Sequence, residues 1–117
     1  MAVQFEQGAA IPLEQLITHL KSKADTLKEK VPVNAIYLFG SHAAGRATCY
    51  SDVDLAVISP VLGDNIISEG VMLMNAFDDA GKNIFTEPLI YSPDDLETAE
   101  SGTFLHDEII KKGIRIC

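Results

Sequence analysis

Apolar residues at intervals of three and four predict a long helix near the start of the chain. They follow Pro12 at Leu13, Leu16, Ile17, Leu20, Ala24, Leu27 and Val31. This spacing places side chains on one face of a helix. Pro12 suits the first helical turn, where its missing N–H group is not needed. Pro32 ends the pattern, because proline cannot continue a helix.

Two short apolar runs on either side of a glycine-serine turn predict neighbouring strands. Residues 35–39 are nearly all apolar, and residues 53–58 are mostly apolar. Continuous runs of this length fit strands that are covered on both faces. Gly40 and Ser41 turn the chain after the first strand, and we expect a brief helix there that ends at Gly45.

Helical and strand patterns alternate through the second half of the chain. Helical spacing returns at Ile66, Ile67, Gly70, Val71, Met74 and Phe77, where we expect the methionine and the phenylalanine to belong to the core. Residues 84–91 are typical of a third strand, and Pro88 places that strand at a sheet edge or at a bulge. Turn signals near residues 92–95 and at Gly102 introduce two further helices. The order predicts an α/β (α+β) fold, with helices packed on a small mixed β-sheet of three to five strands.

Length and composition indicate one folded core. The chain has 117 residues, of which 47% are hydrophobic, with a mean hydropathy of +0.14. We therefore expect a single domain over residues 1–117. No apolar run approaches the roughly 18 residues of a membrane span, and residues 1–6 lack the pattern of a signal peptide. These features predict a cytoplasmic protein, in which Cys49 and Cys117 are free thiols.

The net charge of the chain indicates which kinds of ligand it can bind. The chain carries 17 acidic and 9 basic residues, a formal charge of −8. Such a surface repels a phosphate backbone, so binding to long nucleic acid is not expected. A small phosphorylated substrate is compatible with this charge if metal ions supply the positive charge.

Two aspartates at the beginning of the second apolar run, one directly before it and one within it, require an explanation. Asp52 and Asp54 are two positions apart, so in a strand their side chains lie on the same face. Two carboxylates side by side repel each other, and a divalent cation such as Mg²⁺ relieves that repulsion. The alternative is that Asp52 is a solvated residue beyond the strand and that Asp54 is hydrogen-bonded to a neighbour.

The glycine-serine pair favours the interpretation of the two aspartates as a cation site. A strand followed by Gly40-Ser41 at a helical turn offers free backbone N–H groups and a hydroxyl, which together suit a phosphate. The full pattern is Gly-Ser, ten residues, then Asp-x-Asp. At average residue usage, chance would place it in a chain of this length roughly once in a thousand.

These residues resemble the signature of a known family. Gly40, Ser41, Asp52 and Asp54, with Leu55 directly after, are similar to the motif of the minimal nucleotidyltransferases. These belong to the polymerase-beta-like superfamily, and the resemblance covers essentially the whole chain. It implies that fold, a site for two Mg²⁺ ions on the two aspartates, and ATP as a substrate whose phosphates lie at the glycine-serine turn.

The resemblance also implies a third carboxylate on a neighbouring strand, and Glu87 is the candidate catalytic and metal-binding residue. By alternation Glu87 shares a face with Leu89 and other apolar residues, although it also fits an edge-strand glutamate that faces water. Asp94 and Asp95 are weaker candidates, since their Ser-Pro setting is typical of a helix cap.

One basic residue is a candidate ligand for the phosphates. Relatives often carry an arginine at the position of Ala44, and Arg46 is the residue that replaces it here, unless it is a solvated loop residue. His42 follows the turn and is a candidate for the rim of the pocket. His19 and His106, on predicted helices, are expected to be incidental.

The implied activity is transfer of a nucleoside monophosphate, AMP from ATP, to a hydroxyl acceptor. Family members of this size are often the antitoxin partners of helical HEPN-domain toxins, so we expect a protein partner of that type or a homo-oligomer. The alternatives are a non-catalytic subunit of the same fold that regulates a partner by contact, a transferase acting on a small molecule, and a coincidental motif.

Overall fold

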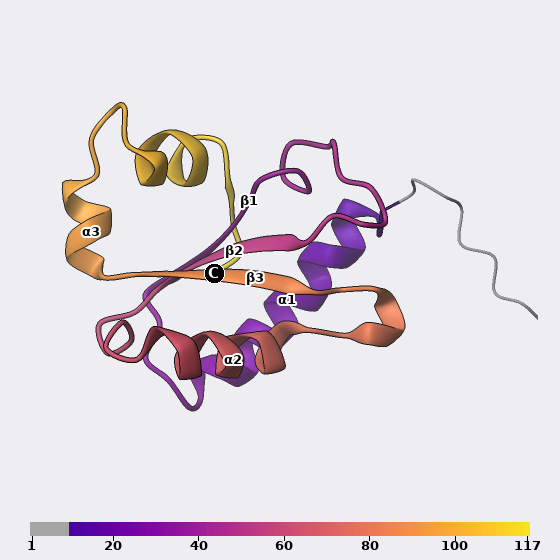
Figure 1. Cartoon of the computed structure of the whole chain (residues 1–117), viewed down its shortest axis with the longest axis horizontal. Helices are drawn as coiled ribbons and strands as arrows, with labels where there is room; N and C mark the ends of the chain where they lie inside the picture. The colour runs from indigo at the N-terminus through magenta and orange to yellow at the C-terminus, as the bar shows by residue number, and fades with distance from the viewer. Residues whose placement is uncertain (1–9) are drawn as a thin grey trace, which may run out of the picture.

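A computed structural model describes residues 10–117 as one sheet with helices on both faces (Figure 1). The elements in chain order are α1 (Leu13–Lys28), β1 (Ala35–Phe39), β2 (Val53–Ile58), α2 (Ile66–Phe77), the 3-10 turn η1 (Ala80–Lys82), β3 (Thr86–Tyr91), α3 (Pro93–Thr98), the π-helical turn η2 (Leu105–Ile110) and β4 (Ile114–Arg115). Residues 1–6, on which the expectation about a signal peptide rests, lie outside the described residues. Among the described helices, none is long and apolar enough to cross a membrane.

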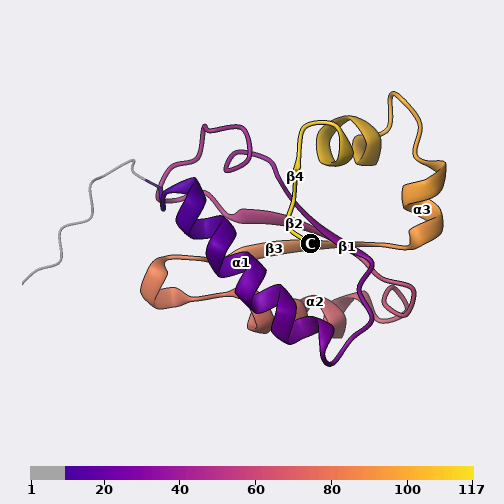
Figure 2. The ribbon, with the colours of Figure 1, turned by 180° about the vertical axis from the view of Figure 1, so that it is seen from behind.

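The sheet is mixed and has four strands in the order β3-β2-β1-β4. β1 runs antiparallel to both β2 and β4, whereas β2 and β3 are parallel. Seen from either side, α1 and α2 cover one face and η2 covers the other (Figures 1 and 2). This confirms the expected α/β layer structure and the small mixed sheet.

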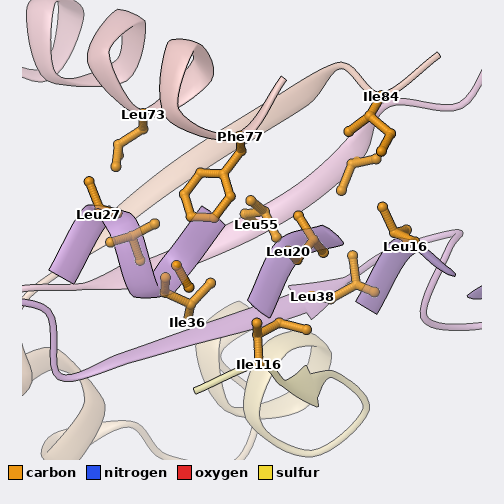
Figure 3. Close-up of a cluster of buried hydrophobic side chains, with 13 residues drawn as sticks. Leu16, Leu20, Leu27, Ile36, Leu38, Leu55, Leu73, Phe77, Ile84 and Ile116 are labelled. Carbon is orange, nitrogen blue, oxygen red and sulfur yellow. The ribbon is translucent and has the colours of Figure 1, made fainter. Parts of the chain in front are cut away.

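Alternation along the strands divides the core into two layers. One side of β1 and β2 packs against α1 and α2 (Figure 3), with Leu16, Leu20, Leu27, Ile36, Leu38, Val53, Leu55, Leu73 and Phe77 among its buried residues. The other side packs against η2 and contains Ala35, Tyr37, Phe39, Ala56, Ile58, Leu105 and Ile109. Because both sides are covered, all five residues of β1 are buried, as the apolar run predicts.

β3 lies at the edge of the sheet, as Pro88 predicts. Two interactions hold the beginning of this strand in place. The carboxylate of Asp78, at the end of α2, accepts hydrogen bonds from the backbone N–H and the hydroxyl of Thr86. The N–H of Val53 donates to the carbonyl of Phe85 at 2.8 Å. These contacts fix the register of β3 against β2.

Three predictions about secondary structure and core packing differ from the structure. The chain after Gly40 forms turns and not a helix, and the third strand begins at Thr86 and not at residue 84. The prediction that Met74 belongs to the core is wrong, because this side chain is 40% exposed. Residues 114–115 form a short strand that the pattern did not indicate.

Candidate functional site

Asp54 and Glu87 lie side by side on the face of the sheet that η2 partly covers. They are register partners on the parallel strands β2 and β3, so their side chains leave the sheet on the same face. Asp54 is partly buried, and Glu87 is exposed. The alternation argument for Glu87 therefore predicts its position correctly, while its chemical role stays a prediction.

The closeness of these two acids changes the ionisation of Asp54. Burial, followed by the negative charge of Glu87, raises the pKa of Asp54 from 3.8 to about 6. A hydrogen bond from the protonated Asp54 to Glu87 and the charge of Asp52 act in the same direction. The pair is thus an electrostatically unfavourable arrangement near neutral pH, which a bound cation would relieve.

Asp52 stands at the edge of this pair. It precedes β2, and its side chain is exposed. Within residues 10–117, no three Asp, Glu, His or Cys side chains are close enough to form a metal-binding group. The structure therefore brings Asp54 and Glu87 together and leaves Asp52 nearby on a more open part of the chain.

Gly40, directly after β1, lies against the acid of β2. Its φ of 77° lies in the left-handed region, which favours glycine. A Cβ atom on this residue would also collide with Oδ2 of Asp54. The carboxylate of Asp54 thus lies directly against the backbone of the glycine-serine turn.

The residues after Gly40 expose several backbone donors. The N–H of Ala44 donates to the carbonyl of Gly40 and the N–H of Arg46 donates to that of Ser41, which curls the segment into turns. Within residues 10–117, the N–H groups of Ser41, His42 and Ala43 donate to no acceptor. Successive free N–H groups beside a turn form a concave anion site. The side chain of Arg46 is exposed at the end of this segment.

Two side chains hold the loop of residues 41–52 in place, and sequence reasoning predicted neither contact. His42 is buried, not at the rim of a pocket, and its Nε2 lies 3.3 Å from the carbonyl oxygen of Ser51. The amide of Asn83 donates to the carbonyl of Cys49 at 2.7 Å. The phosphate-binding candidates and Asp52 are consequently parts of one restrained loop. No local pattern indicates either contact, because each joins residues that only the fold brings together.

An aromatic pair begins next to Asp54, on the same face of the sheet. Phe39 is the register partner of Asp54 on β1. The ring of Phe104, just before η2, packs against Phe39 with centroids 5.7 Å apart and an interplanar angle of 84°. Phe104 was missed by sequence reasoning, since the turn around Gly102 gives no indication of where the following residues pack.

The remaining candidates have other roles. The carboxylate of Asp95 accepts a hydrogen bond from the N–H of Ser92 in a capping box at the start of α3. His19 contacts the carbonyl of Phe77, and His106 contacts Asp107. A groove of about 1040 Å³ lies between the start of α1 and η1, but none of the three candidate acids lines it. We place the site at the acids, because that is where the chemically significant groups converge.

Comparison with known proteins supports the fold and the family. The family model described as "Polymerase beta, Nucleotidyltransferase" matches residues 21–117. Among solved structures, the chain is similar to a candidate nucleotidyltransferase from Sulfolobus solfataricus, with a TM-score of 0.59. The two share 13% identity over 88% of this chain and 80% of that chain, which shows a common fold. No curated protein matches significantly.

Proposed function

Because the chain belongs to the polymerase-beta nucleotidyltransferase family, we propose that it transfers a nucleoside monophosphate to a hydroxyl group, with AMP from ATP as the transferred group. The observation that carries this proposal is the register pairing of Asp54 with Glu87 directly beside Gly40. Two acids and an anion-binding turn in contact are what phosphoryl chemistry with a cation requires.

The donor chemistry of the site fits Mg²⁺. Asp52, Asp54 and Glu87 offer hard carboxylate oxygens. Burial and, after it, the negative charge of Glu87 raise the pKa of Asp54, and a bound cation would stabilise the charged carboxylate against both effects. Bound Mg²⁺ would neutralise the triphosphate and activate the acceptor hydroxyl. The exposed side chain of Asp52 is free to turn toward the ion, since no described hydrogen bond holds it.

The protein's own groups supply the rest of the proposed site. The free N–H groups of Ser41, His42 and Ala43 bind the terminal phosphates, and Arg46 adds positive charge at the end of the turn. Glu87, on the open side of the acid pair, accepts the proton of the acceptor hydroxyl.

Incubation with α-labelled ATP and Mg²⁺ in the presence of a cell lysate tests this activity. We expect label on an acceptor with the wild-type protein and a loss of several orders of magnitude for Asp54→Asn. Asp25→Asn, at an exposed acid on α1, is the matched control and should retain the activity. Equal labelling by wild type and Asp54→Asn contradicts the proposal.

We also propose a protein partner, of the helical HEPN toxin type, that binds α2. The structure exposes an apolar patch on α2, the α2 patch, formed by Ile66, Ile67, Val71 and Met74. Exposed apolar patches of this kind often mark interaction surfaces. Segment 63–79 carries four acidic residues and no lysine or arginine, so charge favours a partner with a basic rim over a second copy of this chain.

The same patch supports a second candidate function, a non-catalytic subunit that regulates its partner by contact. Co-expression with the product of the adjacent reading frame separates the two. Asp54→Asn retains partner control if contact suffices and loses it if nucleotide transfer is required. Ile67→Glu, on the α2 patch, should release the partner in both cases.

A further inference from the structure

Phe39, Asp54 and Glu87 form one row across β1, β2 and β3. Phe39 pairs with Asp54, and Asp54 pairs with Glu87, so all three side chains lie on the same face of the sheet. The ring of Phe39 is 94% buried, and Phe104 is the aromatic ring that packs edge-to-face against it. Phe104 is therefore one side chain away from the acid pair.

The ring of Phe104 is partly exposed to solvent and is held on its inner side by Phe39. It is 53% exposed, although it contacts a buried ring on the inner side. Phe85, directly before β3 and two positions from Glu87, is exposed to a similar extent, at 47%. Within residues 10–117, however, Phe39 and Phe104 are the aromatic pair, and no other ring supports Phe85. A ring that is held by a neighbour loses little freedom when a second flat group stacks on it.

We propose that Phe104 is the platform on which the base of the bound nucleoside triphosphate stacks. This inference rests on the proposed function, because it places the triphosphate between the turn at Gly40 and the acids. The base then emerges on the face of the sheet where Phe104 lies. A nucleobase is flat and uncharged, so it tolerates the nearby carboxylates and gains contact area from an aromatic ring.

Comparison of ATP with inorganic tripolyphosphate isolates the contribution of the base. Both ligands are titrated calorimetrically in Mg²⁺ against wild type, Phe104→Ala and Phe104→Tyr. Removal of a stacking ring typically weakens binding by about 5- to 150-fold per base. We expect Phe104→Ala to weaken ATP binding within that range and to leave tripolyphosphate binding unchanged. Phe104→Tyr should restore ATP binding, since it retains the ring.

Phe85→Ala is the matched control, because it removes a similarly exposed phenylalanine two positions from Glu87. It should leave the affinity for both ligands unchanged. If Phe85→Ala weakens ATP binding while Phe104→Ala does not, the base lies on the other side of the acids and the proposal is overturned.

The absence of tryptophan from the sequence provides a direct optical test. Phe104→Trp introduces a single tryptophan, whose fluorescence should be quenched by ATP and not by tripolyphosphate. Phe85→Trp should respond to neither ligand. Quenching by both ligands at position 104 contradicts stacking, because it reports a change caused by the phosphates.

The outcomes distinguish this inference from the proposed function. If wild type binds tripolyphosphate and ATP but Phe104→Ala weakens both equally, Phe104 has only a structural role and the inference fails alone. If wild type binds neither ligand in Mg²⁺, the proposed function fails and the inference fails with it. Thermal unfolding of each variant confirms that the fold is retained.

Discussion

The carboxylate of Asp54 lies against Gly40 so closely that no side chain fits between them. The turn that offers backbone N–H groups and the partly buried acid of β2 are therefore in direct contact. The glycine-serine turn and the acid of β2 are thus held together by van der Waals packing and not by a hydrogen bond.

Gly40→Ala should reduce the free energy of unfolding more than Gly45→Ala does. The φ of 77° at this position strains any residue with a Cβ, by about 1–2 kcal/mol, and the new methyl group also displaces Asp54. Gly45 has a φ of 74° and no heavy atom near its Cβ position, so Gly45→Ala measures the strain alone. Urea unfolding should show a greater loss for Gly40→Ala than for Gly45→Ala. Equal losses would mean that Asp54 moves aside without cost.

Asp54 should make the metal-free protein less stable as pH rises. Its pKa is raised from 3.8 to about 6 in the folded state, so between these values the folded protein binds more protons than the unfolded chain. The stability present below pH 4 is consequently lost as pH rises through 6. One pKa unit corresponds to about 1.4 kcal/mol, and partial solvent exposure reduces the effect.

Asp54→Asn tests this linkage. At pH 7.5 in EDTA we expect the variant to exceed wild type in free energy of unfolding by about 1–2 kcal/mol, with the difference disappearing near pH 4. Asp25→Asn is the control, because this acid is exposed on α1. A variant that is less stable than wild type at pH 7.5 contradicts the assignment of Asp54 as a destabilising carboxylate.

The face on which Glu87 lies could be predicted from the sequence, whereas the surroundings of the site could not. Alternation within residues 84–91 fixes the face of Glu87, and Pro88 fixes the edge position of its strand. These are local properties of a strand. The contacts of His42 and Asn83 depend on how a loop folds back on itself, which periodicity does not encode.

The sequence pattern also could not predict which face of α2 is buried. Helical spacing predicted the helix correctly, but apolar residues occur on nearly every face of it, so the pattern could not select the buried one. The fold buries Leu73 and Phe77 and leaves Ile67 83% exposed. The two-residue strand β4 is too short to produce any periodic signal.

Asp78→Ala should loosen the beginning of β3. Thr86 is 96% buried, so the variant leaves its N–H group and its hydroxyl without their acceptor. Unsatisfied buried donors cost about 1–3 kcal/mol each, and we expect a loss of about 2–3 kcal/mol in urea unfolding. Combining this change with Thr86→Val gives a double-mutant cycle. Additive losses in that cycle would show that the two side chains do not depend on each other.

His42→Ala should release the loop of residues 41–52. The variant removes the contact with the carbonyl of Ser51 and the buried ring that supports it. Arg46 lies in this loop and is exposed, so trypsin should cleave after it several times faster than in wild type. Cleavage after Lys111 serves as an internal control, because that residue lies outside the loop. If cleavage after Arg46 is unchanged, His42 does not restrain the loop, and the contact of Asn83 with Cys49 is sufficient to hold it.

Ile67→Glu should leave the fold intact, and wild type and variant should both be monomeric in the absence of a partner. Ile67 is 83% exposed and lies in the first turn of α2, where a negative charge interacts favourably with the helix dipole. We expect the free energy of unfolding to stay within about 0.5 kcal/mol of wild type. Sedimentation velocity over a hundredfold range of concentration then tests self-association. If wild type forms dimers and the variant does not, α2 mediates contact between copies, and the charge argument for a basic partner is wrong. If both are monomeric, the α2 patch remains available to a different protein, as we propose.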